Sequence, residues 1–188
     1  MLSLPAPVRP ALARRPDDPT VRRTGAAALA AGLAAAADHW LDLVEYRPDS
    51  RWTHLVEPHT AAAALDPSLH PELASAQVWL LSWLPEQGTP LHDHGWSAGA
   101  FGVVRGTLTE RVVAAARHGR PVRQAATELT AGRVRHFGPH YVHQVTNEDT
   151  EPAISVHVYT PALLRMNTYS VVEGLLLHTG SERAGVDW

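Results

Sequence analysis

The spacing of hydrophobic and polar residues changes along this chain of 188 residues. Residues 24–44 are rich in alanine and carry leucines at helical intervals, and the polar run 47–50 follows them. This pattern predicts a helix over 24–44, with Thr24 as its N-cap. Two shorter helical turns are expected at 60–65 and 71–74.

From residue 77 onward the pattern changes to short apolar runs separated by Gly, Pro, Asn and Asp. Runs of β-branched and aromatic residues between such turn signals are typical of strands. The expected strands cover residues 51–57, 78–84, 100–104, 107–113, 122–129, 133–137, 141–146 and 153–159. Short strands at this spacing favour an all-β sandwich or barrel, with the N-terminal helix packed outside it.

The length suits one domain of about 150 residues with terminal extensions. We expect this domain to cover residues 21–173, helix included, after a flexible arm at 1–20 that is rich in Pro and Arg. Residues 174–188 are expected to form a polar tail of uncertain order. No run of about 18 apolar residues predicts a transmembrane helix. The N-terminus lacks the apolar core of a secretory signal, so the expected location is the cytoplasm.

The charge balance and the cysteine count narrow the chemistry. The chain has 16 Lys and Arg against 19 Asp and Glu, for a formal net charge of −3. This balance does not indicate a nucleic acid or an anionic membrane as partner. For the oligomeric state, the expectation is a monomer or small homo-oligomer. Cysteine is absent, which excludes disulfides and thiolate ligands. Any metal must therefore bind to His, Asp or Glu.

Two histidines stand at the spacing of a metal site. Residues i and i+2 of a strand share one face, so His92 and His94 can direct two imidazoles at one point. A third ligand is expected from a later cluster. His143 fits better than His140, because His143 lies within an expected strand and His140 follows Gly-Pro in a turn. The alternative is that His92 and His94 form a polar pair on an exposed strand.

These histidines belong to a longer pattern. The series Gly88-x3-His92-x-His94, Gly106 and His143-x3-Asn147 resembles the paired motifs of the cupin superfamily. The run Ser155-Val156-His157-Val158-Tyr159-Thr160-Pro161 resembles the Ser-x-His-x-Tyr-Ser-Pro run of the cysteine dioxygenase family, and the order of motifs agrees over residues 51–170. The resemblance implies a cupin-type double-stranded β-helix, which is a jelly-roll barrel, with an N-terminal helical segment.

The resemblance also implies the cofactor and the reaction. Many cupins carry a Glu ligand four or five residues after the second His, where this chain has Ala98 and Gly99. A three-histidine site is therefore implied, with Fe(II) on His92, His94 and His143 and with Ni, Mn or Zn as alternatives. Three neutral imidazoles leave the full +2 charge on the metal, which favours a thiolate. Members of the family use O2 to oxidise a small thiol to a sulfinate.

The last motif supplies the candidate catalytic residues. Ser155, His157 and Tyr159 alternate, so one strand face would present a hydroxyl, an imidazole and a phenol in a row. This arrangement suits a hydrogen-bond relay whose Tyr159 end approaches the substrate or dioxygen. The alternative is an outward polar face of an edge strand. Many animal relatives cross-link this tyrosine to a cysteine, but Gly99 occupies that position and no cross-link can form here.

The residues that would bind the substrate depart from the family. Its members hold a substrate carboxylate with an arginine, but the two usual positions hold His54 and Thr168 here. We expect His54 or Arg165 to bind the carboxylate, and a solvated surface position is the alternative for Arg165. Arg51 is not selected, because on a regular strand it would face away from His54. Four further positions match residues that line the pocket in the family, and a generic core position is the alternative for each. They are Trp52, Leu81, Trp83 and Val145. The hypothesis is a cysteine-like thiol that binds differently from the usual substrates.

Two other classes of function fit the same residues. A three-histidine cupin could use zinc to activate water, or nickel or manganese for a different oxidation of a thiol or other small molecule. Zinc without thiol-dependent oxygen uptake would favour this class. A non-catalytic cupin that binds a metal or ligand is the other alternative. In that case Tyr159→Phe would leave every activity unchanged, whereas His143→Ala would abolish binding.

Overall fold

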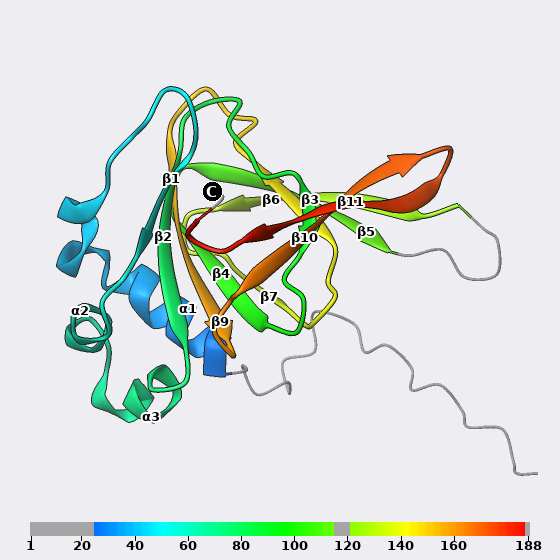
Figure 1. Cartoon of the computed structure of the whole chain (residues 1–188). Coiled ribbons are helices and arrows are strands. Elements are labelled where there is room, and N and C mark those ends of the chain that lie inside the picture. Colours follow the sequence, from blue (N-terminus) through cyan, green and yellow to red (C-terminus); the bar gives the residue numbers. More distant parts are fainter. Residues whose placement is uncertain (1–24, 115–120, 187–188) are drawn as a thin grey trace, which may run out of the picture.

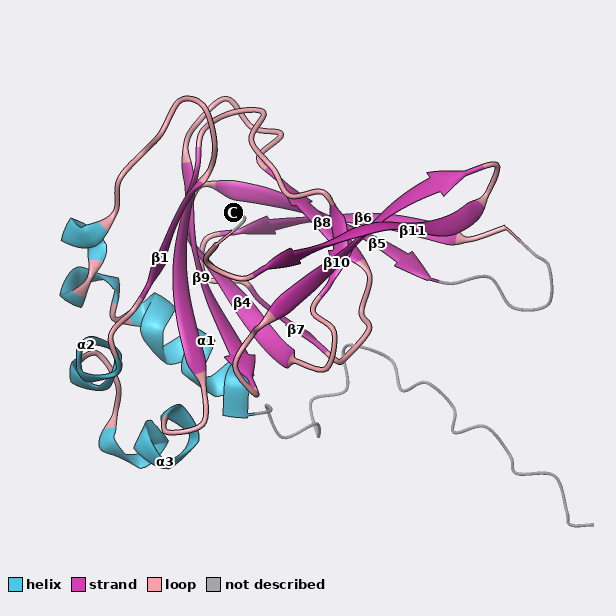
Figure 2. Cartoon of the chain, viewed as in Figure 1, coloured by secondary structure: helices cyan, strands magenta, loops and turns pink. Residues whose placement is uncertain are grey.

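The computed structural model describes residues 25–114 and 121–186 of the chain. Its helices are α1 (Gly25–Ala35), α2 (Pro58–Ala63) and α3 (His70–Leu73). The strands are β1 (Trp52–Leu55), β2 (Gln77–Trp83), β3 (Leu91–Asp93), β4 (Ala98–Arg105), β5 (Thr107–Ala114), β6 (Arg123–Thr130), β7 (Val134–Phe137), β8 (His143–Thr146), β9 (Ala153–Thr160), β10 (Arg165–Val172) and β11 (Leu175–Arg183). The strands dominate, and the helices lie together on one side of the molecule (Figures 1 and 2).

The strands form two antiparallel sheets. The five-stranded sheet has the order β1-β2-β9-β4-β7, and the six-stranded sheet has the order β11-β10-β3-β8-β5-β6. From β2 to β10 the chain crosses repeatedly from one sheet to the other, and only β5 and β6 are consecutive strands of one sheet. Alternation of this kind is the topology of a jelly roll. The expected all-β, cupin-type double-stranded β-helix is confirmed.

The five-stranded sheet has a hydrophobic core on each face. On its outer face, α1 packs against β4, β9 and β7, and its Leu29 and Leu33 share one core cluster with Leu80 and Val156. On its inner face, between the two sheets, residues such as Trp83, Phe101, Leu108 and Tyr159 form a second cluster. Every residue of β9 from Ala153 to Tyr159 is buried because one face contacts α1 and the other faces the interior. Alternation along β9 therefore decides which side chains enter the barrel.

The N-terminal helix is shorter than the sequence predicts. The expected helix over 24–44 appears as α1 followed by two 3₁₀ turns at Ala37–His39 and Leu41–Leu43, and the expected N-cap Thr24 lies outside the described residues. The indole Nε1 of Trp40 donates to the carbonyl of Leu33 at 3.0 Å, which removes an acceptor that a continuing helix would use. No helix in the described ranges has the length and apolar character that a membrane span requires.

The C-terminal part of the chain contains a hairpin that the sequence analysis did not predict. Strands β10 and β11 pair along their whole length, so most of the region expected as a polar tail is a strand at the edge of the six-stranded sheet. The turn uses Glu173 and Gly174, whose φ angles are 50° and 76°. Two consecutive positive φ angles suit the right-handed twist of a hairpin, but glutamate is uncommon at such a position and gave no turn signal.

Candidate metal centre

Three histidines converge inside the barrel. His92 lies in β3 and pairs directly with His143 of β8, and His94 follows at the turn that begins after β3. Their candidate ligand atoms lie within 4.8 Å of one another. The Nε2 atoms of His92 and His94 are 3.1 Å apart, and all three side chains are at most 3% exposed. The structure thus brings together the residues that the sequence analysis selected, and His140 lies outside the cluster.

The three imidazole rings are better suited to binding a cation than to hydrogen bonding with one another. Burial lowers the pKa of His92 and of His94 well below the usual value, and the neighbouring histidines lower it further. Both imidazoles are therefore neutral, with a lone pair available for a metal. The buried Nε2 of His143 has no hydrogen-bond partner. An orphaned nitrogen beside two other imidazoles fits Fe, Ni, Mn or Zn, all of which bind imidazole.

Each ring is held differently behind the cluster. His92 Nδ1 contacts the carbonyl of Pro90 at 2.9 Å, and His143 Nδ1 contacts Glu110 Oε1 at 2.8 Å. The Nδ1 of His94 is buried without a partner, although its ring stacks on Phe137 with centroids 4.5 Å apart. These contacts leave the Nε2 atoms directed at one point. The cluster is therefore preorganised by the surrounding chain.

Glu110 is a functional candidate that the sequence analysis missed. This carboxylate of β5 is fully buried, and besides His143 it accepts from Arg135 Nε at 2.6 Å. The sequence contains a signal for it. Glu110 stands between Leu108 and Val112 at the period of two that marks one face of a strand. A charged residue among apolar positions of a strand indicates a specific partner inside the fold.

Asp93 is a second residue that the sequence analysis missed. It lies between His92 and His94 at the end of β3 and is 2% exposed. Its carboxylate accepts from the backbone N–H of Gly95, from Asn167 Nδ2 at 2.9 Å and from the Tyr169 hydroxyl at 2.7 Å. The latter two come from β10, the strand paired with β3. Asp93 therefore fixes the segment that presents His92 and His94.

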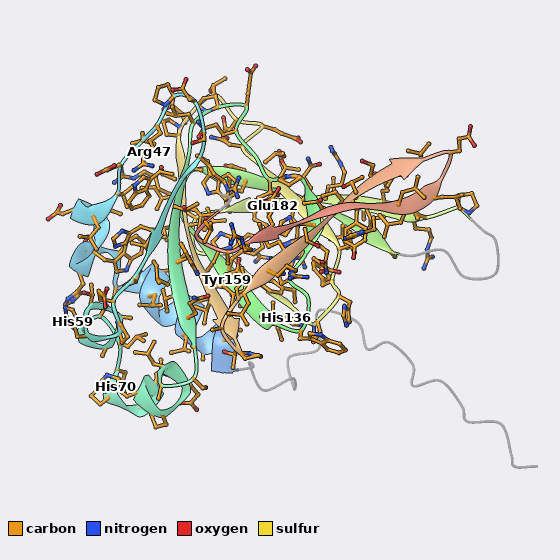
Figure 3. All side chains as sticks on the ribbon, in the orientation of Figure 1. Arg47, His59, His70, His136, Tyr159 and Glu182 are labelled. Carbon is orange, nitrogen blue, oxygen red and sulfur yellow. The ribbon has the colours of Figure 1, made fainter. Side chains whose placement is uncertain are left out.

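The predicted relay on β9 is assembled inside the barrel. Ser155 Oγ lies 2.9 Å from His157 Nε2, and His157 Nδ1 lies 3.5 Å from the Tyr159 hydroxyl. Trp83 Nε1 donates to Ser155 Oγ at 2.9 Å. The Tyr159 ring centroid is 5.1 Å from that of His94, and Figure 3 shows Tyr159 between the two sheets. The relay thus leads from Trp83 to the edge of the histidine cluster.

Burial fixes the protonation states along this relay. It lowers the pKa of His157 to about 3, with smaller contributions from His143 and Arg51. Burial also raises the pKa of Tyr159 above its usual value, although Arg51 opposes the shift. Near pH 7 the imidazole is therefore neutral and the phenol keeps its proton. A neutral phenol at this place can donate a hydrogen bond to a molecule bound beside the histidines.

The expected substrate-contacting residues divide between the two faces of the sheet. Leu81, Trp83 and Val145 belong to the interior cluster that contains Tyr159. Trp52 belongs to the outer cluster under α1, and the ring of His54 stacks on it with centroids 5.4 Å apart. His54 also pairs with Leu80, an outer-face residue. The structure therefore does not bring Trp52 or His54 to the histidine cluster.

The two arginines considered for substrate binding also occupy different environments. Arg165 at the start of β10 is exposed. Arg51 is partly buried just before β1, two residues from Thr53, which pairs with the interior residue Leu81. Its charge opposes the rise in the pKa of Tyr159 and contributes to the low pKa of His92, for which burial is the main cause. Arg51 is therefore the arginine on the barrel side, as the odd offset from His54 predicts.

The fold and the site together define a cupin with a three-histidine metal site. The sequence profile of the family described as "Cysteine dioxygenase type I" matches residues 73–172, more than half of the chain. The chain belongs to this family. The matched range includes the three histidines, Glu110 and the relay on β9. Among curated proteins, none matches the sequence.

Several solved structures are similar to this chain. The protein TT1209 from Thermus thermophilus is 20% identical, with a TM-score of 0.48 over 64% of this chain and 92% of that chain. Oxalate oxidase in complex with glycolate is 14% identical, with a TM-score of 0.47 over 62% and 55%. A cupin 2 conserved barrel domain protein from Salinispora arenicola is 20% identical, with a TM-score of 0.42 over 60% and 76%.

Proposed function

We propose that this protein is an Fe(II)-dependent dioxygenase that converts the thiol of a small, cysteine-like substrate to a sulfinate with O2. The observation that carries the proposal is the position of Tyr159. Its ring lies next to His94, in a buried site where three imidazole nitrogens converge. Family membership supports a metalloenzyme of this kind. A hydrolytic cupin would not require a buried phenol kept neutral beside the metal ligands.

The residues of the site would have separate roles in metal binding, hydrogen-bond donation and exclusion of water. His92, His94 and His143 would hold the iron, which when bound supplies the redox chemistry with dioxygen. The Tyr159 phenol, held by His157, would donate a hydrogen bond to the bound substrate or to dioxygen. Ser155 and the surrounding apolar side chains would keep the relay in place and exclude bulk water.

We further propose that the substrate carries an anionic group and that Arg51 binds it. The guanidinium lies on the barrel side of β1, close enough to Tyr159, His92 and His157 for its charge to influence their protonation. Its Nη1 is 3.5 Å from the carbonyl of Gly88, at the start of the segment that leads to His92. A guanidinium provides paired donors that match a carboxylate. In this proposal Arg51 takes the role that the sequence analysis gave to His54 or Arg165.

The proposed function is tested with the purified protein, reconstituted with Fe(II) without oxygen and then mixed with air-saturated buffer and a thiol. The panel contains cysteine, 3-mercaptopropionate and cysteamine, which lacks a carboxylate. We expect oxygen consumption and a product that has gained two oxygen atoms. His143→Ala should abolish turnover, and Tyr159→Phe should lower kcat. Metal binding without thiol-dependent oxygen uptake for any of the panel would overturn the assignment.

The role of Arg51 is tested in the same assay. Arg51→Gln should raise KM for the carboxylate thiols by about ten- to a hundredfold, the loss expected for a charge-assisted hydrogen bond of about 1.5–3 kcal/mol. Turnover of cysteamine should not change. Arg165→Gln is the matched control because it removes the same charge from an exposed position of β10. If Arg165→Gln raises KM and Arg51→Gln does not, the anchor is Arg165.

A further inference from the structure

No carboxylate belongs to the three-histidine cluster, but the carboxylate of Glu110 contacts one of its histidines from behind. The positions where many cupins carry a ligating Glu hold Ala98 and Gly99 in this chain. Glu110 instead lies behind His143, with Oε1 2.8 Å from the ring Nδ1. A carboxylate on the far nitrogen fixes the tautomer of an imidazole and increases the basicity of the nitrogen that faces the metal. Glu110 can therefore act on a metal without touching it.

Glu110 is enclosed by the fold and forms an ion pair. It is fully buried, and its second oxygen accepts from Arg135 Nε at 2.6 Å. The ring of Tyr141 lies 5.3 Å from that of His143, and Glu110 adds to the rise in the pKa of Tyr141 that burial mainly causes. A buried carboxylate is destabilising unless such partners compensate it. The ion pair with Arg135 engages the second oxygen of Glu110, and the geometry directs its first oxygen to His143.

The other two histidines lack such a partner. His92 contacts a neutral backbone carbonyl through Nδ1, and Nδ1 of His94 has no hydrogen-bond partner. The three imidazoles of the site are therefore chemically unequal, although they are the same residue type. His143 is the strongest electron donor of the three because it alone faces an anion.

We propose that Glu110 is a positioning residue that supplies negative charge to the metal centre through His143, and that Arg135 limits this charge. The arrangement gives a three-histidine site part of the electrostatic character of a site with one carboxylate ligand. It also leaves the coordination positions of the metal open for substrate and O2, because no carboxylate ligates the metal. This inference rests on the metal-binding part of the proposed function and does not depend on thiol dioxygenation.

The test measures the affinity of the apo-protein for Zn²⁺ and Co²⁺ by chelator competition, without thiol or oxygen turnover. Glu110→Gln keeps the size and one acceptor but removes the charge, and it should weaken binding by about ten- to a hundredfold. Arg135→Gln leaves the carboxylate facing His143 and should bind Co²⁺ at least as tightly as the wild type. Glu128→Gln, on the exposed face of β6, is the control for net charge and should have no effect.

The opposite behaviour of Glu110 and Arg135 separates an electrostatic role from a merely structural one. If both variants weaken metal binding to a similar extent, the pair only stabilises the barrel and the proposal is wrong. The proposal is equally wrong if Glu110→Gln binds metal like the wild type. Should Glu110→Gln fail to fold by circular dichroism, Arg135→Gln still decides, because a tenfold loss of affinity in that variant contradicts the proposal.

A spectroscopic signature provides an independent readout. His143 Nδ1 lies 2.8 Å from Glu110 Oε1, so the resonance of a proton on this nitrogen should lie far downfield in the wild-type apo-protein. The resonance should move upfield in Glu110→Gln and remain in Arg135→Gln. The absorption bands of Co²⁺ should also differ between wild type and Glu110→Gln. Identical bands and an unmoved resonance would show that the anion has no influence on the ligand.

Discussion

The indole of Trp83 determines the direction of the relay on β9, because it can only donate a hydrogen bond. Ser155 Oγ accepts this bond, and we expect its own hydrogen to be donated to its other neighbour, His157 Nε2. In that arrangement the single hydrogen of the neutral His157 lies on Nδ1 and points to Tyr159. The Tyr159 oxygen accepts this bond, and its own hydrogen remains available for a bound molecule.

The expected result is a single His157 tautomer, with the hydrogen on Nδ1. Long-range ¹⁵N–¹H correlation spectra of the apo-protein distinguish the two ring nitrogens and measure this directly. Ser155→Ala removes the donor to Nε2 and should give a mixture of tautomers. Ser170→Ala, at an exposed position of β10, is the control and should leave the His157 spectrum unchanged. A hydrogen on Nε2 in the wild type would contradict this direction of the relay.

At the scale of elements, Gly99 determines how closely β4 approaches its neighbours. A Cβ at this position would collide with the carbonyl oxygen of Val158 and would lie 2.8 Å from Cζ of Phe137. Gly99→Ala should therefore lower the free energy of unfolding by about 1–3 kcal/mol through overpacking. Urea denaturation of the apo-protein measures this loss. Gly138→Ala is the control, since a Cβ there meets nothing within 4 Å, and equal stability of the two variants would contradict the argument.

Periodic patterns allowed most elements to be predicted from the sequence. The eight expected strands correspond to β1, β2 and β4–β9, because each alternates or forms a short apolar run between turn residues. The hairpin β10–β11 was missed for a physical reason. β11 is largely exposed at the sheet edge and β10 is mostly half-buried, so the hairpin lacks the apolar period by which buried strands are identified. Pairing between the two strands and with β3 positions this region.

The part of the candidate site that could be predicted is the set of histidines, because their sequence spacing and their ability to bind metals indicate the same site. The series His92-x-His94 and His143 needs only the period of a strand and the position of a paired strand, and the structure assembles it. The face of a strand was harder to assign. Trp52 and His54 matched pocket positions by resemblance, but in β1 their rings stack on the outer face of the sheet, where Trp52 is part of the outer core. Which face packs against a helix is decided by tertiary contacts that four residues do not encode.

At the scale of the whole molecule, the interior combines an apolar core with a group of buried polar side chains. His92, His94, His143, Ser155 and His157 are each at most 5% exposed. Burial lowers the pKa of His92, His94 and His157, so these imidazoles cannot take up protons as they do in the unfolded chain. The barrel that assembles the site should therefore become less stable in acid, and the buried histidines should account for much of that change.

His157 allows this acid sensitivity to be measured. Its pKa falls from 6.5 to about 3 on folding because of burial. Below pH 6.5 the unfolded chain therefore binds a proton that the folded protein excludes, and stability falls continuously until the pH approaches the folded value. At pH 5 the difference is about 1.5 pH units from the unfolded pKa, which corresponds to about 2 kcal/mol.

Urea denaturation of the apo-protein at pH 7 and pH 5 tests this expectation. Between the two values the wild type should lose about 2 kcal/mol more than His157→Gln, which cannot titrate at this position. The other buried histidines are common to both proteins, so the comparison isolates His157. His59→Gln, on the exposed surface of α2, is the matched control and should behave as the wild type. If His157→Gln and the wild type lose stability equally, folding does not lower the pKa of His157, and the expectation is wrong.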